Sequence, residues 1–136
     1  MKVNKIKLAS FIILTIVLII VAVCIFSKKY TLVINDADNI KSVISQKNTS
    51  GGKIEVSSKT LISEIVAAIS SERTTKQKSE GEIPNVEEYY TITFKDSEQK
   101  IYMYIKDGVC YIEEPLNGIY KITQEEYDKI MQYLYF

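Results

Sequence analysis

The feature that most constrains this chain is an uninterrupted apolar run, Leu8–Phe26. The run contains no charged side chain, and its only hydroxyl groups are those of Ser10 and Thr15. At about 1.5 Å per residue, a helix of this length extends about 28 Å, close to the roughly 30 Å hydrocarbon core of a bilayer. A buried helix of a soluble domain would show a polar stripe, and none is visible. The run is therefore predicted to cross a membrane and to contact lipid.

Lysines flank the run on both sides. Lys2, Lys5 and Lys7 precede it, whereas only Lys28 and Lys29 follow directly. This modest excess favours a cytoplasmic N-terminus under the positive-inside rule. The chain is then predicted to consist of a cytoplasmic tip (1–7), a single transmembrane anchor (8–26) and one extracytoplasmic domain (30–136).

Two other interpretations of the run remain open. A cleaved signal peptide would have a shorter apolar region that ends at a small-x-small site, which is missing here. A lipoprotein would carry its lipid on Cys24, but such a cysteine normally follows Gly, Ala or Ser, and here it follows Val23. We therefore favour an uncleaved anchor without lipid.

The composition of the domain argues against several classes of function. All 17 acidic residues follow the run, whereas five of the 17 basic ones lie at or before Lys29, so the domain carries a net charge of −5. Such a surface would repel phosphate backbones, and no nucleic acid partner is expected. The chain has no His, which removes the imidazole base of a Ser or Cys hydrolase and the usual catalytic zinc shell. We expect no cofactor, no metal and no enzymatic activity.

The first half of the domain predicts short elements. Tyr30–Asn35 is typical of a strand, and the segment around Ile40–Ile44 fits one or two helical turns. Lys53–Val56 is β-like, and Ser58 is an expected N-cap for an amphipathic helix. The polar stretch Arg73–Asn85 predicts an irregular connection.

The second half predicts an antiparallel meander. Its first three strands are Glu88–Lys95, Lys100–Lys106 and Val109–Glu113, of which the last two are joined by an Asp107-Gly108 hairpin turn. A fourth strand, Ile119–Ile122, precedes a helix with a Thr123/Glu126 capping box. The expected fold class is α+β, with two helices packed on one face of an antiparallel sheet.

The turns also predict which side chains share a face of the sheet. The hairpin turn pairs Ile105 with Cys110, and a loop at 96–99 pairs Phe94 with Ile101. One face is then an apolar core, with Tyr90, Ile92, Phe94, Ile101, Met103, Ile105, Cys110 and Ile112. The other is expected to be a polar surface rich in tyrosine, with Tyr89, Thr91, Thr93, Tyr102, Tyr104, Tyr111 and Glu113.

The tyrosine-rich face carries the candidate binding residues, Tyr102, Tyr104, Tyr111 and Glu113. Tyr combines a flat apolar ring with a hydroxyl group, which suits recognition of a peptide, a glycan or a protein partner. The alternative is that these tyrosines only stabilise cross-strand pairs and that Glu113 is a solvated charge.

The segment Tyr111–Tyr120, YIEEPLNGIY, resembles the motif of a small Firmicutes domain of unknown function. In that motif Glu114 would be Gln and Leu116 would be Tyr. The resemblance covers about residues 40–135 and implies small membrane-anchored proteins or lipoproteins, and domains appended to BlaR-type sensor peptidases. It implies no catalytic residue. We therefore expect a non-enzymatic binding or accessory module at the cell envelope; a small wall-active hydrolase using Glu113, or an accessory subunit of a membrane complex, is the alternative.

Overall fold

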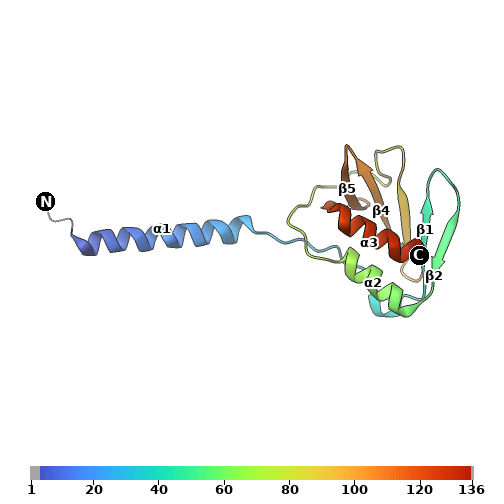
Figure 1. The fold of residues 1–136 in the computed structure, drawn as a ribbon, viewed down its shortest axis with the longest axis horizontal. Coiled ribbons are helices and arrows are strands. Elements are labelled where there is room, and N and C mark those ends of the chain that lie inside the picture. Colours follow the sequence, from blue (N-terminus) through green and yellow to red (C-terminus); the bar gives the residue numbers. More distant parts are fainter. Residues whose placement is uncertain (1–3, 136) are drawn as a thin grey trace.

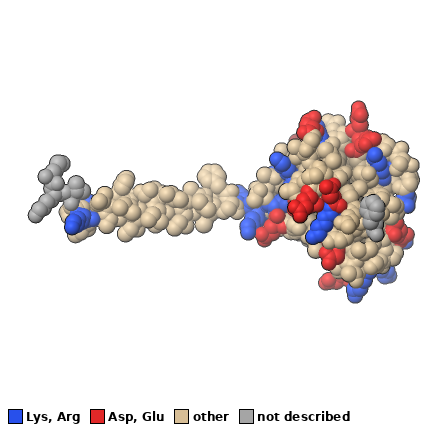
Figure 2. Space-filling view, in the orientation of Figure 1, with Lys and Arg blue, Asp and Glu red and all other residues tan. Residues whose placement is uncertain are grey.

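In the computed structural model, which describes residues 4–135, the apolar run forms one helix, α1 (Lys5–Phe26), that extends away from the rest of the chain (Figure 1). Part of the predicted tip, residues 1–3, and the last residue, Phe136, lie outside the described residues. No residue of α1 is buried, and the helix is long and apolar enough to cross a bilayer. Basic side chains lie at the two ends of α1, whereas the surface of the domain carries both acidic and basic side chains (Figure 2).

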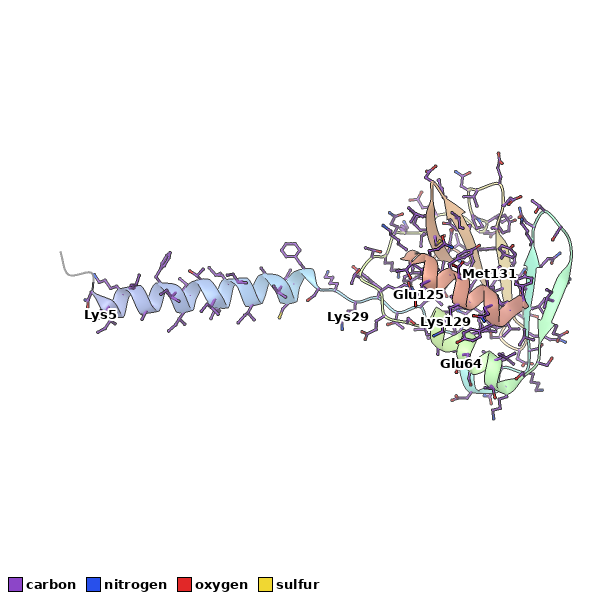
Figure 3. The ribbon with its side chains drawn as sticks, viewed as in Figure 1. Lys5, Lys29, Glu64, Glu125, Lys129 and Met131 are labelled. Carbon is purple, nitrogen blue, oxygen red and sulfur yellow. The ribbon has the colours of Figure 1, made fainter. Side chains whose placement is uncertain are left out.

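The junction between α1 and the domain is short and held at several points. Lys29, which lies at this junction in Figure 3, forms an ion pair of 3.2 Å with Glu72. The next residue, Tyr30, exchanges two backbone hydrogen bonds with Arg73, of 2.7 and 2.8 Å. The buried Arg73 guanidinium donates to three backbone carbonyls, those of Ala68, Ile69 and Ser71. The domain therefore begins within a few residues of the end of α1.

The domain is built on a six-stranded antiparallel sheet with the strand order β2-β1-β3-β4-β5-β6. Two helices, α2 (Lys59–Ile69) and α3 (Gln124–Tyr135), and a 3-10 turn at Ala37–Asn39 complete it. The strands are β1 (Val43–Lys47), β2 (Lys53–Val56), β3 (Tyr90–Phe94), β4 (Gln99–Lys106), β5 (Val109–Glu114) and β6 (Gly118–Ile122). The predicted α+β class, with an apolar N-terminal helix and antiparallel meander, is confirmed.

Two predictions in the first half of the domain are wrong. The segment expected to be helical around Ile40–Ile44 enters strand β1, because Val43 pairs with Val56 on one side and with Phe94 on the other. Tertiary pairing thus overrides the local helical spacing. The predicted strand Tyr30–Asn35 joins a ladder only at Tyr30, since the backbone of Val33 and Asn35 is hydrogen-bonded to the Gln99 side chain instead.

The predicted register is confirmed at the hairpin between β4 and β5. Ile105 pairs with Cys110 there, and the turn residues Asp107 and Gly108 have φ of 52° and 75°. Between β3 and β4 the register differs by two residues, because Ile92 rather than Phe94 faces Ile101. A shift of two leaves every side chain on its predicted face, since side chains alternate along a strand.

The apolar face forms the core beneath both helices (Figure 1), except that Ile105, which was predicted to be part of this core, is exposed near the end of β4. Ile65 of α2 and Ile130 of α3 are fully buried against strand residues that include Ile92. The capping box of α3 is present, because the Thr123 N–H donates to Glu126 at 2.7 Å and the Glu126 N–H donates to the Thr123 hydroxyl at 3.1 Å. The helices leave the tyrosine-rich face to be covered by another part of the chain.

Candidate functional site

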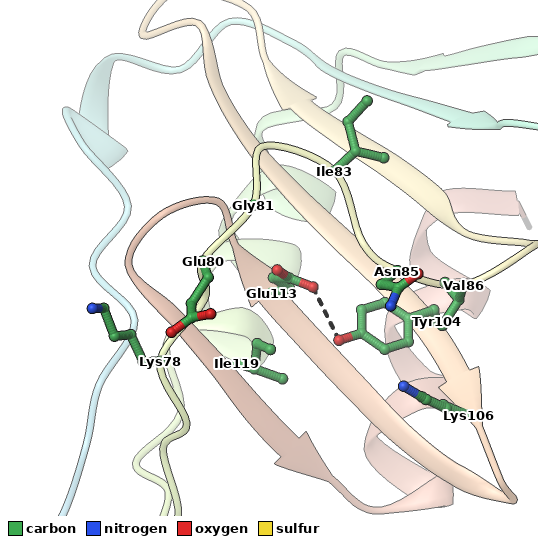
Figure 4. Close-up of a pocket in the computed structure, with 10 residues that line it drawn as sticks. All are labelled: Lys78, Glu80, Gly81, Ile83, Asn85, Val86, Tyr104, Lys106, Glu113 and Ile119. Atoms are coloured by element: carbon green, nitrogen blue, oxygen red, sulfur yellow. Dashed lines mark hydrogen bonds between the residues drawn. The ribbon is translucent and has the colours of Figure 1, made fainter.

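The tyrosine-rich face is covered by the connection between α2 and β3, residues 74–88, which we call the crossing segment. The segment first adds to the outer edge of β6, where Gln77 and Ile119 exchange backbone hydrogen bonds of 2.8 and 2.7 Å. At its far end, the Asn48 side chain donates to the Glu87 carbonyl and accepts from the Tyr89 N–H, both at 2.9 Å. Between these two attachments the chain passes over β5 and β4 (Figure 4).

This cover overturns the prediction of an open, tyrosine-rich surface. Tyr102 is 7% exposed, Tyr104 6% and Glu113 4%, whereas Tyr111 is half-buried. Local pattern could not reveal this burial, because the crossing segment has no apolar periodicity and its path depends on contacts far apart in the sequence.

Glu113 lies beneath the crossing segment, so the alternative interpretation of this residue as a solvated charge is wrong. The Ser79 hydroxyl donates to its Oε1 at 2.6 Å, and the Tyr104 hydroxyl donates to its Oε2 at 3.0 Å. Ser79 is itself 1% exposed and accepts from the Leu116 N–H at 3.2 Å. The carboxylate therefore joins the crossing segment to strands β4 and β5.

Both hydroxyl donors of Glu113 are neutral groups. In residues 4–135, neither Glu113 nor Glu80 has a Lys or Arg nitrogen within ion-pair distance. Burial, followed by the hydrogen bond to Glu113, raises the pKa of Tyr104 above its ordinary value. The phenol therefore stays protonated and keeps donating to the carboxylate over the physiological range.

A cavity of about 340 Å³ lies between the crossing segment and the sheet (Figure 4). This volume is at the small end of the range of ligand sites in proteins. Tyr104 and Glu113 form part of its wall. The other lining residues are Lys78, Glu80, Gly81, Ile83, Asn85, Val86, Lys106 and Ile119.

The four predicted binding residues are only partly brought together. Tyr104 and Glu113 line the cavity, whereas Tyr102 packs edge-on against Tyr89 at a ring distance of 5.3 Å. Tyr111 stacks on Tyr104 at 5.5 Å and faces a separate hollow of about 220 Å³ beside Lys121. Two of the four predicted residues therefore line the cavity, and the other two, Tyr102 and Tyr111, pack against neighbouring tyrosine rings.

A model of a protein family matches residues 28–121; the family is named DUF5301 and described as "Domain of unknown function (DUF5300)". The chain belongs to this family. The match includes the crossing segment and every residue that lines the cavity, and it ends before α3. The predicted resemblance to a domain of unknown function is confirmed at this level.

The DUF5301 fold is also similar to a solved structure, the NMR structure of a protein from Ruminococcus gnavus. The two chains share 24% identity with a TM-score of 0.59, over 71% of this chain and 99% of the other. At this identity the likeness concerns the fold alone. No curated protein matches the chain.

The cavity of this DUF5301 domain also contains residues that sequence reasoning missed. Lys78, Glu80 and Asn85 come from the stretch that was predicted only as an irregular connection, and Lys106 ends strand β4. The one available indication was the concentration of polar residues around Gly81 and Pro84, because long irregular segments often carry functional groups. Nothing in the sequence indicated that this segment lies over Glu113.

Proposed function

We propose that this DUF5301 protein is a membrane-anchored, non-enzymatic binding module whose domain lies on the outer face of the membrane and takes a ligand into the cavity over Glu113. The observation that carries the proposal is a buried carboxylate in a cavity wall, with only neutral hydrogen-bond donors among residues 4–135. Burial of an ionised carboxylate is costly unless its charge is compensated. A bound ligand is one source of that compensation.

The cell-envelope location rests on the anchor and the charge pattern. α1 has no buried residue and supplies the membrane span, and the lysines before it favour a cytoplasmic N-terminus. With only a few residues between Phe26 and the backbone pair of Tyr30 with Arg73, the domain stays at the membrane surface. A ligand would then be an envelope peptide, glycan or protein segment.

The test is to block the cavity without disturbing the hydrogen bonds around Glu113. Asn85 is exposed at the cavity wall, so Asn85→Trp adds bulk there. Gln132→Trp on α3 is the matched control, because α3 packs on the opposite face of the sheet. The full chain in detergent is incubated with soluble envelope extract, and retained compounds are identified by mass spectrometry.

We expect a compound that is retained by the wild type and by Gln132→Trp but is lost with Asn85→Trp. Retention that is equal in all three chains would contradict the cavity as the site.

A hydrolase is the second candidate, and one observation favours it. Glu80 and Glu113 line the same cavity, and glycosidases use two carboxyl groups across a cleft. Release of reducing sugar from cell-wall fragments by the wild type, with loss of this activity in both Glu80→Gln and Glu113→Gln, would replace the binding proposal with this one.

A further inference from the structure

The Glu113 carboxylate can accept more hydrogen bonds than Ser79 and Tyr104 donate, and this restricts which ligands the cavity can bind. Each of its oxygens accepts one hydroxyl hydrogen bond, from Ser79 or from Tyr104, and a carboxylate oxygen has room for a second donor. The side chain is 4% exposed, so water supplies little further solvation. A donor that is also positively charged would satisfy both the free lone pairs and the charge.

The other charges of the cavity lie at separate places along it (Figure 4). Glu80 lies on the same side of Tyr104 as Glu113, which adds a second negative charge there. The Lys78 ammonium group is turned away from Glu113, and Lys106 lies beyond the Tyr104 ring. Lys106 follows Tyr104 by two positions on β4, which places it on the same face, about 7 Å along the strand. Both carboxylates of the cavity wall therefore lie, with the averted Lys78, on one side of the Tyr104 ring, and Lys106 lies on the other.

We infer that the ligand is a small zwitterion of the amino-acid or short-peptide class, whose primary ammonium group binds Glu113 and whose carboxylate faces Lys106. This inference rests on the proposed function and names the ligand class of the same cavity. The Tyr104 ring lies between the two charged ends and offers an apolar surface to the body of the ligand. An anion would be repelled at the Glu113 end, and a neutral sugar would leave the buried charge uncompensated.

The test uses alanyl-alanine as the probe and its N-acetylated form as the control. Both are titrated into the full chain in nanodiscs of neutral lipid, followed by the NMR amide signals of Ser79, Tyr104 and Glu113. Acetylation removes the ammonium charge and leaves the rest of the probe intact. We expect shifts of these signals with the free dipeptide and an affinity at least about 30-fold weaker with the acetylated one, as for the loss of one partner of a buried charge pair.

Protein variants provide an independent measurement. Glu113→Gln keeps the size of the side chain and is expected to weaken the free dipeptide at least about 30-fold. Lys106→Gln, at an exposed position, is expected to weaken it several-fold, since rim charges contribute less. Equal affinity for the two dipeptides, or binding that Glu113→Gln leaves unchanged, would overturn the inference.

The experiments distinguish a wrong ligand class from the absence of a binding function. If neither dipeptide binds, but an envelope compound is still lost with Asn85→Trp, the cavity is a binding site and the zwitterion class is wrong. If no compound depends on Asn85, the binding function itself fails.

Discussion

Tyr104 and Tyr111 face each other across β4 and β5 with their ring centroids 5.5 Å apart. Only one of their two hydroxyl groups forms a hydrogen bond with another described residue. The Tyr104 hydroxyl donates to buried Glu113, whereas that of Tyr111 has no hydrogen-bond partner among the described residues. Tyr104→Phe leaves a carboxylate oxygen without its donor, so we expect the free energy of unfolding to fall by about 1–3 kcal/mol. Tyr111→Phe is the matched control, with a change within about 0.5 kcal/mol. Urea denaturation measures both, and equal losses would show that the hydroxyl bond contributes nothing specific.

The buried tyrosines also predict how stability responds to alkaline pH. Burial raises the pKa of Tyr127 to about 12, and burial together with Glu113 raises the pKa of Tyr104. A tyrosine in the unfolded chain ionises near pH 10, so above that pH the unfolded state has lost protons that the folded state still holds. The stabilising effect of Tyr127 is therefore complete below about pH 10 and is lost as the pH rises toward 12. Unfolding measured from pH 8 to 12 should show this fall, with a smaller slope in Tyr127→Phe; an unchanged slope in the variant would contradict the assignment.

At the scale of elements, the crossing segment depends on Ser79 for its attachment to the sheet. Ser79→Ala removes the 2.6 Å bond to Glu113 and the acceptor of the Leu116 N–H. We expect a loss of about 1–3 kcal/mol in stability and faster amide hydrogen exchange in residues 79–88. Thr75→Ala, at an exposed position of the same segment, is the control. Exchange that rises equally throughout the domain would indicate that the segment does not open by itself.

The elements of the domain differ in how well the sequence alone predicts them. The Asp107-Gly108 turn and the Thr123/Glu126 capping box act over a few residues, so their patterns predicted the hairpin and the start of α3. Strand β1 and the crossing segment are defined by partners far along the chain. Val43 pairs with Phe94, and Ser79 reaches Glu113. For this reason the faces of the sheet were predictable, whereas the cover over Tyr104 and hence the cavity were not.

At the scale of the whole molecule, the junction links α1 to the domain. Lys29 pairs with Glu72, and Tyr30 is bonded to Arg73, so the end of α2 is held close to the end of α1. The proposed envelope ligand can reach the cavity only if the domain lies on the outer face of the membrane. The orientation of α1 is therefore the central claim about the molecule.

Labelling with a membrane-impermeant maleimide on intact protoplasts tests that claim most directly. Ser50→Cys places a thiol in the exposed β1–β2 loop, and Asn4→Cys places one before α1. The parent chain gives the background, since Cys110 is buried and Cys24 lies within α1. We predict that position 50 is labelled in intact protoplasts and that position 4 is labelled only after lysis. Labelling of position 4 in intact protoplasts, with position 50 protected until lysis, would contradict the account.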